Sequence, residues 1–283
     1  GRALIAFLME VAAADEAGRD DAPEPDTVPT APPEPHPEIQ RLEAGKGTRI
    51  GNAIHQIFED REIGRPVAEQ PELVRQALKQ HDVHEARLPP ERLEPLLAQR
   101  IDAALAAELL PGLVLGALPA HALRAEMGFH FPLDAVSLDA LRRAAREHDE
   151  PDLVPAGPAH ALRGLMTGKI DLTLQHDGRF HVLDYKGNWL GPAVADYQGE
   201  ALTRAMDAHH YRFQALIYTV AVHRYLRQRV PGYEPAQHLG EGIYLFVRAA
   251  GLAPGAGVWA HRFPDALIDA IDAALAGQRE VAA

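Results

Sequence analysis

The sequence predicts an α/β protein in which a mixed central β-sheet is flanked by helices, with an N-terminal helical part. Three observations lead to this fold class. Helical periodicity fills residues 48–109, strand-like and helical segments alternate after residue 120, and two strand-like runs flank the dipeptide Asp177-Gly178. The order helices, strands, helix, strands, helix is typical of domains in which helices cover a sheet. A chain of 283 residues can bury a substantial core.

The composition excludes several functional classes. The chain has no cysteine, which rules out disulfides, thiolate nucleophiles, structural Cys-zinc sites and cysteine-bound iron–sulfur clusters. A formal net charge of −12 rules out a uniformly basic nucleic-acid-binding surface, although it leaves room for a local basic patch. The most apolar stretch, residues 109–120, is short and interrupted by two prolines. We therefore expect a cytoplasmic protein with no membrane partner.

The first forty residues differ from the rest of the chain. Residues 1–14 are interpreted as the end of a preceding region and not as a signal peptide, because Glu10 interrupts the apolar run. Residues 15–40 are acidic and rich in proline, which predicts a linker without fixed structure. Residues 1–40 hold nine acids and two arginines, so much of the negative charge lies outside the predicted folded domain, residues 41–283.

The elements of this domain follow in order. Thr48 can cap a first helix, whose apolar positions are Ile50, Ile54, Ile57 and Phe58. Further helices are expected at 71–80, 90–109, 137–147 and 207–229, and from 264 onward. Strands are expected at 123–133, 241–248 and 257–262, together with the two runs that flank Asp177-Gly178. That dipeptide is favoured in two-residue type I′ turns and predicts a β-hairpin.

The register of this hairpin juxtaposes two carboxylates. If Asp177 and Gly178 form the turn, Asp171 lies directly opposite Asp184, and Lys186 shares a face with Asp184. Carboxylates about 5 Å apart repel by roughly 3 kcal/mol at an effective dielectric of about 20. We therefore expect a cation between them, either a divalent metal, Lys186 or both. The alternative is a solvent-exposed strand pair with scattered charges, against which the apolar neighbours argue.

Several motifs together resemble a known family. Asp171 followed by Asp184-Tyr185-Lys186 has the pattern of the PD-(D/E)XK nuclease superfamily. The other motifs are G-x-x-x-H at 51–55, G-x-I-D at 168–171, L-D-Y-K-x-N-W-L-G at 183–191, H-x-Y-x-x-Q-x-x-x-Y at 209–218 and G-I-Y-L-F-x-R at 242–248. The combination is similar to RecB-type C-terminal nuclease domains, from the beta subunit of exodeoxyribonuclease V, over about 47–248.

This resemblance implies a restriction-endonuclease-like fold and Mg²⁺-dependent hydrolysis of DNA, by exonuclease or endonuclease action, in double-strand break repair and recombination. Ca²⁺ is expected to occupy the metal site without supporting the reaction. The implied metal ligands are His55, Asp171, Asp184 and the carbonyl of Tyr185. The implied catalytic residues are Asp171, Asp184 and Lys186, supported by Gln214 and Tyr218, while Glu126 is a weaker match to a further acid of the family.

The implied partners are DNA as single strands or unwound ends, the helicase part of the same subunit, RecC- and RecD-type subunits, and a RecA-type recombinase. Residues 204–229 are the most basic stretch, with five arginines and one acid, and aromatic residues lie among them. Arg204 and Arg212 are therefore candidate phosphate contacts. The alternative is an amphipathic helix with a solvated cationic face.

One residue departs from the family pattern, since Gly187 follows Lys186 where serine is more usual. The rival functions have weaker support. No complete Walker A loop is present, so ATP binding is not expected from this chain. The histidines of this chain offer no second pair at the spacing that a zinc site needs. A glycosidase could use the two carboxylates, but its mechanism gives no role to Lys186. A non-catalytic docking module for partner subunits or a recombinase is a second candidate function, and a stand-alone PD-(D/E)XK exonuclease is a third.

Overall fold

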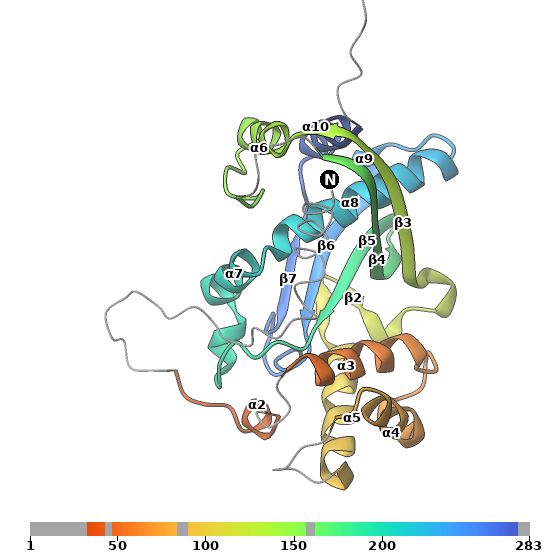
Figure 1. The fold of residues 1–283 in the computed structure, drawn as a ribbon. Helices are drawn as coiled ribbons and strands as arrows, with labels where there is room; N and C mark the ends of the chain where they lie inside the picture. The colour runs from red at the N-terminus through yellow and green to blue at the C-terminus, as the bar shows by residue number, and fades with distance from the viewer. Residues whose placement is uncertain (1–32, 43–46, 84–89, 157–161, 277–283) are drawn as a thin grey trace, which may run out of the picture.

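The computed structural model describes residues 33–42, 47–83, 90–156 and 162–276. Its centre is a five-stranded sheet in the order β3-β4-β5-β6-β7 (Figure 1). Strands β5 and β6 are parallel and the other neighbours are antiparallel, so the predicted mixed sheet is confirmed. The strands are β3 (Leu123–Val136), β4 (Leu162–His176), β5 (Arg179–Lys186), β6 (Leu239–Phe246) and β7 (Val258–His261).

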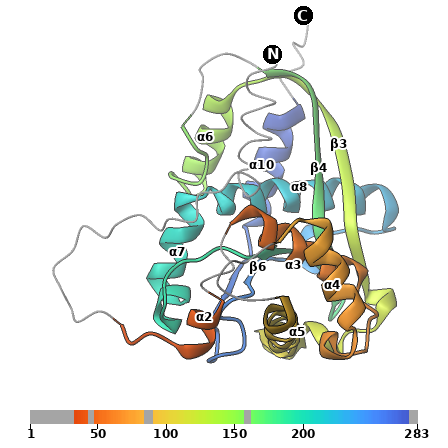
Figure 2. The same cartoon turned by 60° about the horizontal axis from the view of Figure 1, so that its bottom comes forward.

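Helices cover both faces of this sheet, and each face has its own apolar core. The N-terminal helical layer packs on one face, and Figure 2 shows it from its own side. It contains α3 (Thr48–Asp60), α4 (Pro71–Gln80) and α5 (Pro90–Ala106), followed by the small strands β1 (Glu108–Leu110) and β2 (Leu113–Val114). The other layer contains α6 (Leu138–Glu147), α7 (Gly199–Ala208), α8 (Tyr211–Arg229) and α10 (Asp265–Ala276), while the short α9 (Pro235–His238) precedes β6.

The predicted β4–β5 hairpin is confirmed. Its register pairs His176 with Arg179 and continues to Leu172 opposite Leu183. Asp177 and Gly178 have φ values of 48° and 77°, and two consecutive positive φ angles are typical of a type I′ turn. Glycine and aspartate enter this left-handed region more readily than most residues, which is why the dipeptide predicted the turn.

Three helix predictions need correction. Thr48 is the first residue of α3 and not its cap, because Gly47 occupies the N-cap position. The helix predicted at 90–109 ends at Ala106 and gives way to β1. The helix predicted at 207–229 is two helices, since α7 ends at Ala208 and α8 begins at Tyr211. His210 between them has φ 56°, a left-handed conformation that cannot continue an α-helix.

Strands β3 and β4 bend where the active-site motif lies. Side chains two apart on a strand normally share a face, yet Ile170 belongs to the core beneath α8 and Leu172 to the core beneath α3. Glu126 on β3 lies opposite Asp171, because its neighbours Ala125 and Met127 pair with Leu172 and Ile170 of β4. Its φ angle is 53°, in the left-handed region. The side chains of β4 therefore switch from one face of the sheet to the other next to Asp171.

The last residues of the predicted linker pack on the domain. Helix α2 (Pro37–Arg41) places Ile39 in the core with no exposed surface, and the N–H of His36 donates to the carbonyl of Pro192 at 2.8 Å. The boundary expected at residue 40 thus falls inside a packed element. Residues 1–32, which hold most of the predicted linker, lie outside the described residues. Within the described part, none of the helices is long and apolar enough to cross a membrane.

Candidate active site

Asp171 in the middle of β4 and Asp184 near the C-terminal end of β5 lie where the pairing of the two strands stops. Pairing follows the predicted register as far as Leu172 and Leu183. At the next position the Asp171 carboxylate accepts a hydrogen bond from the backbone N–H of Tyr185 at 3.0 Å. The side chain of Asp171 therefore replaces a backbone acceptor where the strands separate, and this bond ties it to the strand that carries Asp184.

Helix α3 brings His55 to the same place. Its Nδ1 atom lies 3.2 Å from Oδ2 of Asp171. Burial disfavours the charged imidazole, but the carboxylates of Asp171 and Asp184 outweigh it and raise the pKa of His55 to about 9. Burial also disfavours the charge of Asp171, yet His55, Lys186 and the N–H of Tyr185 hold its pKa below the ordinary value.

Strand β5 ends in a buried ion pair. Asp184 is 3% exposed and Lys186 is 1% exposed, and the Lys186 Nζ atom lies 2.7 Å from Asp184 Oδ2. A lysine is stable in such a position only when its charge is paired and hydrogen-bonded. Lys186 therefore supplies a cation beside Asp184, which is one of the possibilities that the sequence predicts.

Helix α8 and strand β6 surround the Lys186 ammonium. Its Nζ lies 4.1 Å from the ring centroid of Tyr211 and 5.3 Å from that of Tyr244. The Oε1 atom of Gln214 lies 3.5 Å from Nζ and accepts a hydrogen bond from the Tyr244 hydroxyl at 2.7 Å. Gln214 in turn donates to the Tyr218 hydroxyl at 3.2 Å. Of the predicted supporting residues, Gln214 thus lies next to the predicted catalytic lysine, and Tyr218 contacts Gln214.

Glu126 lies across from Asp171 on the neighbouring strand. It forms an ion pair with Lys169, which precedes Asp171 by two residues. Burial, Glu126 and other nearby acids including Asp171 raise the pKa of Glu59 on α3. Sequence reasoning missed Lys169 and Glu59. The shared strand face of residues 169 and 171 could have indicated the first, and the helical spacing of residues 55 and 59 the second.

The two candidate DNA-binding arginines have different environments. Arg204 on α7 is 62% exposed, and its guanidinium lies 3.9 Å from the carboxylate of Glu200. Arg212 on α8 is 19% exposed and pairs with Glu150 at 2.5 Å and with Asp207 at 3.2 Å. Arg212 can therefore reach a phosphate only by leaving two carboxylates, whereas Arg204 can do so by a simple rotation.

The donor atoms suit a hard divalent cation, although they do not form a ready-made cage. In the described part of the chain, no three His, Asp or Glu side chains are arranged to enclose a metal ion. The two carboxylates are instead engaged in ion pairs, Asp171 with His55 and Asp184 with Lys186. Carboxylate oxygens on adjoining strands and an imidazole from α3 are nevertheless ligand types that divalent metals accept.

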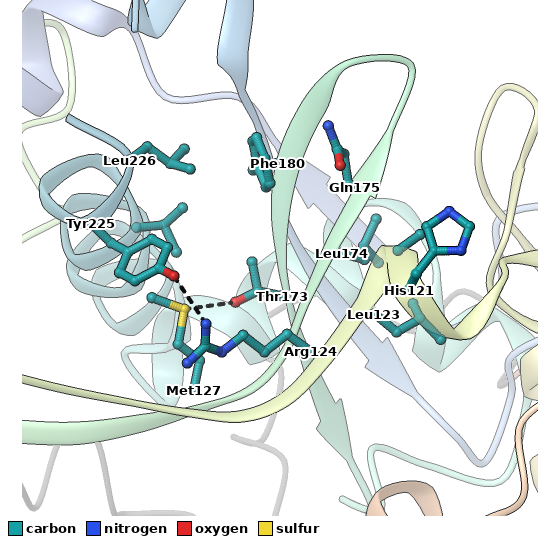
Figure 3. Close-up of a pocket in the computed structure, with 12 residues that line it drawn as sticks. His121, Leu123, Arg124, Met127, Thr173, Leu174, Gln175, Phe180, Tyr225 and Leu226 are labelled. Atoms are coloured by element: carbon teal, nitrogen blue, oxygen red, sulfur yellow. Dashed lines mark hydrogen bonds between the residues drawn. The ribbon is translucent and has the colours of Figure 1, made fainter. Parts of the chain in front are cut away.

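A hollow of about 190 Å³ lies elsewhere, between α8 and strands β3, β4 and β5 (Figure 3). Its lining is mainly apolar and includes Met127, Phe180 and Leu226, while Arg124 crosses it to donate to the Tyr225 hydroxyl at 3.0 Å. None of the predicted metal or catalytic residues lines it. The candidate active site is therefore the cluster around Asp171 on β4 and the C-terminal end of β5.

Comparison with known proteins identifies the family. The sequence profile of the PD-(D/E)XK nuclease superfamily matches residues 33–276. The chain belongs to this superfamily. It is 36% identical over 242 residues to the RecBCD enzyme subunit RecB of Escherichia coli, covering 82% of this chain and 19% of that protein. It is 31% identical over 239 residues to the RecB subunit of Haemophilus influenzae, covering 83% of this chain and 19% of the relative.

The RecB subunit of Mycolicibacterium smegmatis is 33% identical over 229 residues, or 71% of this chain and 21% of the relative. The chain thus spans about a fifth of the length of these relatives. The resemblance predicted from the motifs is confirmed, as is the PD-(D/E)XK fold.

The departure at Gly187 from the PD-(D/E)XK pattern has a packing reason. A Cβ atom on Gly187 would lie 3.3 Å from the Cα of Gly51 and 3.3 Å from Cδ1 of Ile54. Helix α3 therefore approaches the residue after Lys186 closely, and glycine leaves room for it. The close approach also carries His55 toward Asp171.

Proposed function

We propose that this chain is a Mg²⁺-dependent deoxyribonuclease domain, which hydrolyses phosphodiester bonds by exonuclease or endonuclease action. Membership of the PD-(D/E)XK nuclease superfamily supports a nuclease. The single observation that carries the proposal is the buried Asp184–Lys186 pair beside the Asp171–His55 pair. A binding module has little use for two adjoining acids and a lysine in a buried position, since each charge is costly to desolvate.

Each side chain has a proposed role. His55, Asp171, Asp184 and the Tyr185 carbonyl would hold the metal. Mg²⁺, when bound, would polarise the scissile phosphate and lower the pKa of a water molecule. Lys186 would orient the attacking water and offset the negative charge that grows in the transition state. Gln214 and Tyr218 would support Lys186.

Broader roles follow from the RecB relatives and are part of the proposal. We infer that the domain acts in double-strand break repair and recombination, in the cytoplasm, as part of a RecBCD-type helicase–nuclease. Its partners would be unwound or single-stranded DNA, a helicase part of the same subunit, RecC- and RecD-type subunits and a RecA-type recombinase. Arg204 is the better placed of the two candidate arginines to contact a phosphate because it is exposed.

The test is cleavage of linear single-stranded DNA at high protein concentration, with Mg²⁺, with Ca²⁺ and with a chelator. Of these three conditions, we expect cleavage only with Mg²⁺. The Asp184→Ala variant should lose this cleavage and should bind the metal more weakly in calorimetry. No cleavage by the wild type, either alone or joined to its motor subunits, would contradict the proposal and favour a docking module. Undiminished metal binding by Asp184→Ala would remove that residue from the ligand set.

A further inference from the structure

The ammonium of Lys186 lies between the rings of two tyrosines that belong to the quoted motifs but to which the sequence assigned no role. Its Nζ is 4.1 Å from the ring centroid of Tyr211 on α8 and 5.3 Å from that of Tyr244 on β6. Both tyrosines are buried, at 1% and 0% exposure. A cation within about 6 Å of an aromatic face is attracted to it, more strongly where water is excluded. The two rings therefore restrict where the ammonium can lie.

The hydroxyl of Tyr244 also sets the orientation of Gln214. It donates to Gln214 Oε1 at 2.7 Å, and the same oxygen lies 3.5 Å from Lys186 Nζ. The other end of the amide donates to the Tyr218 hydroxyl at 3.2 Å. If the amide were reversed, its NH₂ group would face the donor-only ammonium, and the Tyr244 hydroxyl would lose its acceptor. The Tyr244 hydroxyl thus acts with the ammonium to keep the carbonyl oxygen of Gln214 toward Lys186.

The sheet places Tyr244 where it can do this. In the parallel pairing of β5 and β6, Tyr244 is the partner of Asp184, and the partner of Lys186 is Phe246. Tyr211 is held from the other side, since its hydroxyl lies 3.3 Å from Oδ1 of Asn188, just beyond the end of β5. Rigid elements therefore support both rings.

We propose that Tyr211 and Tyr244 are positioning residues for Lys186. Tyr211 holds the ammonium through its ring, and Tyr244 holds it through its ring and through the orientation of Gln214. Together they direct Nζ to the Asp184 carboxylate, the place from which it would act on the water and the phosphate. This inference rests on the proposed function for its catalytic consequence, but its structural content can be tested without activity.

The first experiment uses the small number of lysines. The chain has four, Lys46, Lys79, Lys169 and Lys186. In protein labelled with ¹³C at the lysine ε-carbon, ring currents should move the Lys186 ε-CH₂ proton signal upfield, and Lys186→Ala identifies that signal by its loss. Tyr211→Leu should move the signal back toward the exposed lysines, and Tyr211→Phe should leave it in place. A Lys186 signal without an upfield shift, or one that Tyr211→Leu does not move, would overturn the proposal.

The second experiment measures kinetics in Tyr244→Phe, which keeps the ring and loses the hydroxyl. We expect kcat to fall about 10- to 100-fold with KM and metal affinity little changed, since misplacement of a reacting group by about 1 Å can cost about 10²-fold. In a Gln214→Ala background the same change should have no further effect, because the amide it orients is gone. Unchanged kcat in Tyr244→Phe, or full additivity with Gln214→Ala, would contradict the role of Tyr244.

A matched control is Tyr233→Phe, which removes the hydroxyl that lies 2.9 Å from Nδ1 of His223, away from the site. It should leave kcat unchanged, and a loss equal to that of Tyr244→Phe would contradict a specific role. A wild type that shows the shifted Lys186 signal but cleaves no DNA would refute the proposed function while leaving the positioning of Lys186 supported. A wild type that cleaves DNA but lacks the shifted signal would refute the positioning alone.

Discussion

The guanidinium of Arg248 donates a hydrogen bond to the carbonyl of Leu42 at 2.6 Å and a second one to the carbonyl of Gly187 at 2.7 Å. Arg248 is 2% exposed, so both bonds are shielded from water. This side chain joins the segment that enters the domain to the residue that follows Lys186. The short helix α2 is therefore tied to the wall of the candidate active site.

A chain that begins at residue 43 should accordingly be less stable than one that begins at residue 33. It loses Ile39 and Leu42 from the core and leaves the Arg248 guanidinium without one acceptor. Burial of two such side chains contributes about 1.5–3 kcal/mol each, so a loss of roughly 3–6 kcal/mol in unfolding free energy is expected. Urea denaturation of both chains measures it, and equal transition midpoints would show that α2 contributes nothing.

Asp171→Asn should separate the charge of this residue from its hydrogen bond. The amide oxygen can still accept the N–H of Tyr185, so the fold should persist, but the lost charge should weaken divalent-metal binding more than about tenfold and abolish most cleavage. Titration calorimetry with Mg²⁺ and with Ca²⁺ provides the measurement. The control is Asp177→Asn in the hairpin turn, an acid with an 87% exposed side chain, which should bind metal like the wild type.

The two candidate DNA-binding arginines should respond differently to removal. Arg204→Ala should leave stability unchanged, weaken binding to single-stranded DNA and reduce the slope of log affinity against log salt by about 0.7. Arg212→Ala should lower the unfolding free energy by about 1–3 kcal/mol, because it leaves the half-buried carboxylate of Glu150 without that partner. Fluorescence anisotropy across a salt series, combined with denaturation, distinguishes them. A salt slope that Arg204→Ala does not alter would exclude that contact.

Stability should depend on pH through His223. Burial lowers the pKa of His223 below its ordinary value of 6.5, and although Asp272 and Asp269 favour its charge, Arg227 and Arg224 oppose it. The unfolded chain then binds the proton more readily, so this contribution to stability is complete above about pH 6.5 and is lost as the pH falls below that value. His223→Gln should show a smaller decline than the wild type between pH 7.5 and 5 in urea denaturation, and an identical decline would contradict the assignment.

The sequence predicted the parts of this molecule that depend on local chemistry. Asp177-Gly178 predicted the hairpin register, and the structure follows that register from His176 opposite Arg179 to Leu172 opposite Leu183. The parts it could not predict depend on contacts distant in sequence. The left-handed His210 divides one predicted helix, and Glu126 bends β3 in a conformation that no residue preference indicates. The rings of Tyr211 and Tyr244 come from α8 and β6, and the sequence does not show that these elements pack around Lys186.

The central claim is that Lys186 acts in catalysis and not in metal binding. Its direct test is the cleavage rate of linear single-stranded DNA with Mg²⁺ for the wild type, Lys186→Ala and Lys186→Arg, with Lys79→Ala as the exposed-lysine control. We expect Lys186→Ala to keep the fold at lower stability in the absence of metal, to keep its metal affinity and to lose about 10²–10³ in rate. Lys186→Arg should restore little, because a guanidinium fork cannot place a point charge in the same position. Wild-type cleavage that persists unchanged in Lys186→Ala would contradict the claim.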